Sequence, residues 1–360
     1  MSDGPSSRLG ERYASLRAYH TAKDPLPIKL DANESSLALP DAVTHAIARS
    51  VRTWDLQRYP DLAARTLRGA IAARIGAHPD ELVLGVGSDE SIGIAMRALD
   101  RPSAKGPPAV LFGTPTFVMY DITARVQGFA PVAVPLDDEF DLDVDAMLRA
   151  IDEHDPSLVF LATPNNPTGN AFSDGRIERV IEAAPNALVV IDEAYAPFAG
   201  RTTPFFGRHP NVATLGTLSK IGLAGLRVGW LRAPATLAHE IDKARPPYNL
   251  PTPSQSIAVE LLTRHADVLD AGIRETIAER DRVVAALTAL GSVRVRPSDA
   301  NFILIEVPDA ARAHRHLADD GIQVRRFDDP RLSSALRVTI GTRDENGALI
   351  ASLRAYVGAE

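Results

Sequence analysis

Cysteine is absent from the 360 residues, which excludes disulfides, thiolate metal sites and cysteine nucleophiles. The nine histidines show no HExxH pattern, so no metal site is expected. No apolar stretch reaches membrane-spanning length, and the N-terminal MSDGPSSRLGERY lacks the hydrophobic core of a signal peptide. We therefore expect a cytoplasmic protein that does not associate with a membrane.

Acidic side chains outnumber basic ones. The net charge of −7 and the lack of any long basic run argue against a nucleic-acid partner. Hydrophobic content of 45% and charged content of 24% are ordinary for a globular protein, and the length suffices for one large domain and a smaller one. Lysine is rare, with five residues at positions 23, 29, 105, 220 and 243.

Seven short apolar runs read as strands, and helix-length segments separate most of them. They are LVLG (82–85), AVLF (109–112), APVAVPL (130–136), SLVFLA (157–162), ALVVI (187–191), VATLG (212–216) and RVGWLRA (227–233). This alternation predicts an α/β fold with a mainly parallel seven-stranded sheet covered by helices. After residue 253 a long helix and further strands indicate a smaller α+β unit. We therefore predict a large domain at 40–253 and a second unit made of an N-terminal arm, 1–39, together with 254–360.

Polar motifs directly follow five of the predicted strands. They are GSDE (87–90), TPTF (114–117), TPNNPTG (163–169), DEAY (192–195) and TLSK (217–220). Sheets of this kind bind ligands at the carboxyl ends of their strands. We therefore expect the five motifs to converge on one site.

The motif GSDE opens a helix near Ser88, and the free N–H groups and dipole of such a helix suit a phosphate. Ser88 could equally cap an ordinary helix. Thr217, Ser219 and Arg227 supply three further phosphate donors, of which Arg227 can bind in a bidentate way. A nicotinamide oxidoreductase is disfavoured because GVGSDES lacks the third glycine of G-x-G-x-x-G.

Asp192 ends the buried run ALVVID, where a carboxylate is costly without a cationic partner. It could form a salt bridge or cap a helix. It could also hold the ring nitrogen of pyridoxal 5'-phosphate protonated, so that the ring acts as an electron sink. Tyr195 and Asn166 could then bind the ring hydroxyl, and Phe117 could stack on the ring. The alternatives are a simple turn at NNPTG and a core position for Phe117.

Lys220 follows an apolar strand and lies beside two hydroxyl residues, a context that an ordinary surface lysine fits badly. A free lysine, with a pKa of about 10.4, is a poor nucleophile at neutral pH. As a Schiff base with pyridoxal phosphate it is held ready, and once released it can act as a local base. The sequence therefore predicts Lys220 as the covalent amine, acting with Asp192 and Tyr195.

The ordered set GSDE, TPTF, NNPTG, DEAY, TLSK and GLR resembles the fold-type I, pyridoxal-phosphate-dependent aminotransferases. Within that family, KLDANES, RYPD, DANFIL, GIQVRRF and LRVTIGT resemble the histidinol-phosphate aminotransferases, and the resemblance covers nearly the whole chain. It implies a homodimer with shared active sites and a smaller domain that moves over them. The implied reaction, in histidine biosynthesis, transfers an amino group between L-glutamate and imidazole-acetol phosphate, forming L-histidinol phosphate and 2-oxoglutarate.

Carried over residue by residue, the resemblance adds further members to the site. Asp89 would lie with Ser88 at the phosphate, and Tyr59 of RYPD would reach the phosphate from the neighbouring subunit. Arg337 of LRVTIGT would bind the carboxylate of glutamate or the phosphate of the other substrate. Arg325 and Tyr19 are further candidates for substrate binding.

Three departures from the family pattern bear on the choice of substrate. Phe117 stands where many members have tyrosine, ESS follows LDAN where ENP is commoner, and Arg227 lies seven rather than eight residues after Lys220. The alternative is an aromatic amino-acid aminotransferase or a phospho-amino-acid decarboxylase on the same scaffold. A non-catalytic regulator that binds pyridoxal phosphate would need a fused DNA-binding segment, which the sequence does not provide.

Overall fold

The computed structural model describes residue 16 and residues 26–358. Its large sheet has seven strands in the order β2-β8-β7-β6-β5-β3-β4, and β8 alone is antiparallel to its neighbours. The strands are β2 (Leu82–Val86), β3 (Ala109–Thr114), β4 (Ala130–Pro135), β5 (Leu158–Ala162), β6 (Leu188–Asp192), β7 (Val212–Thr217) and β8 (Val228–Arg232). Each predicted apolar run forms one of them, and the predicted fold class is confirmed.

Side chains of the central strands alternate between two apolar layers. In β5, for example, Val159 and Leu161 pack in one core cluster, whereas Leu158 and Phe160 pack in the other. Because both faces are buried, the strands read as continuous apolar runs rather than as alternating ones. The same period of two sends Asp192 to the face of β6 that holds Leu188 and Val190.

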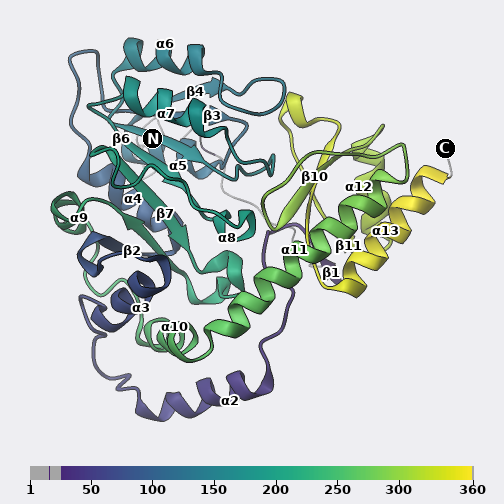
Figure 1. The fold of residues 1–360 in the computed structure, drawn as a ribbon, viewed down its shortest axis with the longest axis horizontal. Helices are drawn as coiled ribbons and strands as arrows, with labels where there is room; N and C mark the ends of the chain where they lie inside the picture. The colour runs from purple at the N-terminus through teal and green to yellow at the C-terminus, as the bar shows by residue number, and fades with distance from the viewer. Residues whose placement is uncertain (1–15, 17–25, 359–360) are drawn as a thin grey trace, which may run out of the picture.

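Helices cover both faces of this sheet (Figure 1). Side chains of α6 (Val144–His154) and α7 (Asp174–Ala183) pack on one face. Those of α4 (Gly87–Ala98), α5 (Met119–Gln127) and α9 (Ala235–Asp242) pack on the other. Near β2 and β8 lie α2 (Asp41–Ser50), α3 (Arg65–Ile75) and α10 (Thr252–Arg264), which share a third cluster. A short α8 (Ala196–Ala199) follows β6.

The C-terminal part forms a smaller unit around a four-stranded antiparallel sheet in the order β12-β13-β10-β9. Its strands are β9 (Arg294–Val295), β10 (Phe302–Glu306), β12 (Arg325–Arg326) and β13 (Ala335–Thr339), and its helices are α12 (Ala310–Asp319) and α13 (Arg343–Gly358). A parallel pair joins β1 (Ile28–Lys29) of the N-terminal arm to β11 (Ile322–Gln323). The described part of the arm thus packs with the C-terminal unit.

The long helix α11 (Ala266–Thr288) runs from the large unit to the smaller one (Figure 1). Near its start Leu269 packs in the cluster of α3 and α10, and near its end Val283 and Leu287 pack in the core of the smaller unit. Since α10 also packs on α3, apolar contacts with the large unit continue past residue 253. The division of the chain at 253/254 stays a prediction.

Gly229 allows β8 to approach the turn that begins α4. A Cβ there would overlap the backbone of Gly87 and Ser88, which cannot move aside as a flexible side chain could. We predict that Gly229→Ala lowers the free energy of unfolding by about 1–3 kcal/mol, measured by urea denaturation. As a control, Gly69→Ala within α3 meets open space and should be neutral or stabilising by up to about 1 kcal/mol. Equal effects of the two changes would contradict this account.

Candidate active site

The motifs that follow the strands converge on one pocket, as expected. Ten of the side chains selected from the sequence line it, from both the large sheet and β13: Ser88, Asp89, Phe117, Asn166, Asp192, Tyr195, Ser219, Lys220, Arg227 and Arg337. Thr217 lies directly beneath, where its hydroxyl donates to Ser219 Oγ at 2.9 Å. The roles assigned to these residues remain proposals, but their convergence is a structural fact.

Asp192 lies at the floor of the pocket and is 6% exposed. Tyr120 Oη donates to its Oδ2 at 2.6 Å, and the backbone N–H of Ala194 donates to its Oδ1 at 3.0 Å. Burial raises the pKa of the Asp192 carboxyl, and these two hydrogen bonds act in the opposite direction. Burial and the adjacent carboxylate also raise the pKa of Tyr120 well above its usual value, so Tyr120 is a donor at neutral pH.

Lys220 lies in a short 3₁₀ turn, η4 (Ser219–Ile221), directly after β7. Its Nζ is 5.6 Å from the centre of the Tyr195 ring, and its charge favours the ionised form of Asp192. The left-handed Gly222 (φ 101°) ends this turn. An amine on a short rigid turn at the mouth of a pocket is well placed for covalent chemistry.

Beside Lys220, the side chains of Arg227 and Ser219 and the start of α4 form a group of donors suited to an anion, which we call the anion cup. Arg227 Nη2 bonds Asp89 Oδ2 at 2.9 Å, and Arg227 Nη1 is 3.5 Å from Ser219 Oγ. At Gly87 (φ 74°), a Cβ would lie 2.6 Å from Arg227 Nη2, so glycine makes room for the guanidinium. Because α4 begins at Gly87, the N–H groups of its first turn have no intrahelical acceptors. That of Gly87 donates to the Arg227 carbonyl at 2.9 Å, and those that follow are available to an anion.

The opposite wall of the pocket joins the two units. Arg337 of β13 donates through Nη1 to Asn166 Oδ1 at 2.5 Å and through Nη2 to the carbonyl of Asp31. Asn33 Nδ2 donates to Tyr195 Oη at 3.0 Å. The Phe117 ring meets Tyr120 edge to face, with ring centres 5.7 Å apart. The Asn166 and Tyr195 side chains are thus fixed by partners from the arm and from β13.

Besides Thr217, three selected residues are not among those that line this pocket. Tyr59 is 80% exposed and stacks on Tyr248 with ring centres 4.6 Å apart. Arg325 lies in β12 opposite Arg337, and Tyr19 lies outside the described residues. The role of Tyr59 stays a prediction because it is expected to act on a neighbouring subunit. The substrate-binding roles of Arg325 and Tyr19 stay predictions as well.

Sequence reasoning missed two polar residues of the pocket, Tyr120 and Asn33. Asn33 is part of KLDANES, and the sequence alone assigns it no role. Tyr120 lies in the first turn of α5, three residues after Phe117, which precedes the helix; in a continuous helix this spacing would place both on one side. That spacing was the available signal, but it is equally typical of two core aromatics.

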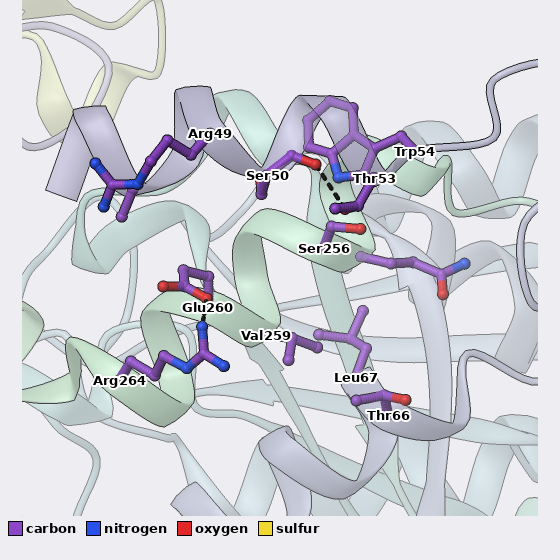
Figure 2. A pocket seen from close by; sticks show the side chains of 12 residues that line it. Arg49, Ser50, Thr53, Trp54, Thr66, Leu67, Ser256, Val259, Glu260 and Arg264 are labelled. Carbon is purple, nitrogen blue, oxygen red and sulfur yellow. Dashed lines mark hydrogen bonds and ion pairs between the residues drawn. The ribbon is translucent and has the colours of Figure 1, made fainter.

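A second hollow lies between α2, α3 and α10 (Figure 2). Arg49, Trp54, Leu67, Glu260 and Arg264 are among its lining residues, and Glu260 pairs with Arg264 at 2.9 Å. None of the selected side chains that the structure describes is among its lining residues. The described residues contain no group of histidine and acidic side chains that could hold a metal ion, and none of their helices combines the length and hydropathy that a membrane span requires.

Comparison with known proteins decides the family. Residues 26–353 match the model of the class I and II aminotransferases. The chain belongs to this family. It is 41% identical over 371 residues to histidinol-phosphate aminotransferase of Paracidovorax citrulli, covering 99% of this chain and all of that one. The chain is therefore an aminotransferase.

Solved structures show the same fold. Histidinol-phosphate aminotransferase from Sinorhizobium meliloti, solved in complex with pyridoxal-5'-phosphate, superposes with a TM-score of 0.85 at 24% identity, covering 98% of each chain. L-threonine-O-3-phosphate decarboxylase from Porphyromonas gingivalis superposes with a TM-score of 0.77 at 19% identity, covering 92% of this chain and 99% of that one. The fold alone therefore does not separate a transaminase from a decarboxylase.

The hydrogen bond from Tyr120 to Asp192 yields a pH-dependent prediction for the ligand-free protein. Tyr120→Phe keeps the ring but leaves the buried carboxylate with one donor fewer, so the pKa of Asp192 should rise further. A carboxyl whose pKa is raised in the folded state destabilises that state increasingly as pH rises from the unfolded pKa to the raised pKa, and fully at higher pH. We therefore predict a loss of about 2 kcal/mol in unfolding free energy near pH 7.5, shrinking as pH falls through the raised pKa.

Tyr356→Phe is the matched control, because this buried hydroxyl donates to a neutral carbonyl, that of Asp309, at 3.2 Å. It should cost about 1 kcal/mol at each pH. Urea denaturation of both variants at several pH values makes the comparison. A pH-independent loss for Tyr120→Phe would contradict the assignment of Asp192 as its charged partner.

Proposed function

We propose that the chain is a pyridoxal-phosphate-dependent histidinol-phosphate aminotransferase. It would transfer an amino group between L-glutamate and imidazole-acetol phosphate, forming L-histidinol phosphate and 2-oxoglutarate. The main observation in support of this chemistry is that one pocket contains the buried Asp192 carboxylate, Lys220 and the anion cup with Arg227. The substrate rests on the full-length similarity to the Paracidovorax citrulli enzyme.

The residues of the pocket fit pyridoxal phosphate. Asp192 has no cationic side chain within ion-pairing distance among the described residues, so a protonated ring nitrogen would supply the missing counter-charge. Arg227, Ser219 and the start of α4 would hold the phosphate, and the Phe117 ring would cover one face. When bound, the cofactor supplies a carbonyl carbon that bonds to amines and a ring that accepts electrons.

The protein's own groups then divide the remaining work. Lys220 Nζ would hold the cofactor at rest and, once released, could move a proton to and from the substrate carbon. Asp192 would keep a proton on the ring nitrogen, since its carboxylate is buried and accepts from Tyr120. Tyr195 and Asn166 would bind and orient the ring oxygen. Arg337 offers its guanidinium to the substrate carboxylate or phosphate.

We propose further that the chain acts as a homodimer in the cytoplasm. Val51, Leu56, Tyr59, Leu62 and Tyr248 are large apolar side chains that are more than 40% exposed. Four of them fall within twelve residues, and Tyr59 stacks on Tyr248. An exposed apolar group of this kind is typical of an interface between chains. A second copy of the chain would cover this apolar group, and Tyr59 could then reach the anion cup of that second copy.

Covalent attachment to Lys220 is the first test of this proposal. Borohydride added to the protein with pyridoxal phosphate should fix the cofactor onto the peptide that contains Lys220, as read by mass spectrometry. Lys220→Ala should still bind the cofactor but lose at least about 10²-fold in turnover. Lys243→Ala removes an exposed lysine paired with Glu240 and should change neither result. Stoichiometric labelling at another lysine would rule out the mechanism.

Substrate choice requires a separate measurement. The cofactor-loaded protein is mixed with L-histidinol phosphate, L-phenylalanine or L-aspartate, and the conversion of bound aldehyde to amine is followed by absorbance. We expect the highest kcat/KM with histidinol phosphate, because the chain is similar over nearly its whole length to an aminotransferase named for this substrate. A clear preference for phenylalanine would replace this substrate with an aromatic amino acid. Release of carbon dioxide from a phosphorylated amino acid would instead indicate a decarboxylase.

A further inference from the structure

Asn33 lies where the N-terminal arm, β13 and the active-site pocket meet. It is 1% exposed and lines the pocket. Its backbone is left-handed (φ 53°), a conformation that asparagine tolerates better than most residues. The Asn33 carbonyl accepts from Asn301 Nδ2 at 3.2 Å, which ties the arm to the C-terminal unit. The side chain is therefore held by a fixed backbone.

Two hydrogen bonds to Thr339 orient the Asn33 amide. The backbone N–H of Asn33 donates to Thr339 Oγ1 at 2.9 Å, so this oxygen already acts as an acceptor. The Thr339 hydroxyl then donates its own hydrogen to Asn33 Oδ1 at 3.1 Å. The amide nitrogen is left facing the other way, and it donates to Tyr195 Oη at 3.0 Å.

The opposite orientation of the amide is disfavoured. It would turn Oδ1 toward Tyr195 and leave the hydroxyl hydrogen of Thr339 without an acceptor among the described residues. Thr339 is 1% exposed, so water cannot replace that acceptor. A buried donor without a partner is costly. The direction of the whole chain of hydrogen bonds is therefore set by one threonine hydroxyl on β13.

The Tyr195 hydroxyl thus accepts from Asn33 and keeps its own hydrogen free for another acceptor. Its ring packs edge-on against Phe302, with ring centres 5.1 Å apart, and the residue is 6% exposed. We propose that Thr339 and Asn33 are positioning residues that hold Tyr195 as a hydrogen-bond donor toward the ring oxygen of the bound cofactor. This inference rests on the proposed function.

The consequence is visible in the absorbance of the bound cofactor. A donor to the ring oxygen draws off negative charge, so the nitrogen that joins the cofactor to Lys220 holds its proton less tightly. Loss of that donor should raise the pKa of the coloured group. The charged side chains that line the pocket are Asp89, Asp192, Lys220, Arg227 and Arg337, and Thr339→Val neither removes nor adds a charge among them. A shift in that variant would therefore report on the hydrogen bond.

The test is a spectrophotometric pH titration of the cofactor-loaded protein. Thr339→Val removes the hydroxyl at nearly constant volume and should raise the pKa of the coloured group by about one unit. Thr339→Ser keeps the hydroxyl and should titrate as the unchanged protein does. Asn33→Asp presents only acceptors to Tyr195 and should shift the titration upward even if Thr339→Val folds poorly. Because it adds a charge, it is compared with Tyr195→Phe combined with Asn33→Asp, in which the shift beyond that of Tyr195→Phe measures the effect of the charge alone. The proposal is overturned if Thr339→Val produces no shift, or if Asn33→Asp produces no shift beyond this charge effect.

A double variant separates this inference from the function on which it rests. Tyr195→Phe should raise the same pKa, and adding Thr339→Val to it should produce no further shift, because the effect passes through the Tyr195 hydroxyl. An added shift in the double variant overturns the hydrogen-bonded relay from Thr339 through Asn33 to Tyr195 and leaves the proposed function standing. If Tyr195→Phe itself produces no shift, both the relay and the role of Tyr195 in the proposed function fail.

Discussion

The pocket depends on one constraint, the burial of the Asp192 carboxylate at the end of a central strand. Taking a carboxylate out of water costs several kcal/mol unless donors replace the water. The fold supplies them from Tyr120 at the start of α5 and from the backbone of Ala194. Both donors are uncharged, and no cationic side chain among the described residues lies within ion-pairing distance of the carboxylate. A bound cation would therefore stabilise this site.

The second constraint is that the pocket lies between two sheets. Arg337 is 8% exposed, and a buried guanidinium must find acceptors, which it does at Asn166 and at the carbonyl of Asp31. These partners come from the large unit and from the arm. A ligand that displaced either acceptor from Arg337 would break a contact that joins the two units. Binding of such a ligand would then be coupled to the relative placement of the units.

Much of this arrangement follows from the sequence because it depends on local patterns. Strands buried on both faces read as apolar runs, and ligand sites lie at their carboxyl ends, so the convergence of Ser88, Asn166, Asp192 and Lys220 was predictable. The contacts of Tyr120 and Asn33 were not, because their partners lie 72 and 162 residues away. A tyrosine on the buried face of a helix is interpreted as a core residue until the strand opposite it is known. The sequence likewise does not decide which unit α10 packs against, since an amphipathic helix can cover either one.

The spacing of seven residues between Lys220 and Arg227 shows how the fold absorbs a departure from the family pattern. The chain between them makes two 3₁₀ turns, η4 and η5 (Ala224–Leu226), separated by a left-handed Gly222. Arg227 is itself left-handed (φ 52°), and its carbonyl accepts from the N–H of Gly87 at 2.9 Å. That bond fixes the guanidinium over the start of α4, where it pairs with Asp89. Since Asp89 already shares this charge, a phosphate bound here would draw on the N–H groups of α4 as well as on Arg227. The seven-residue turn thus ties the arginine to the start of α4.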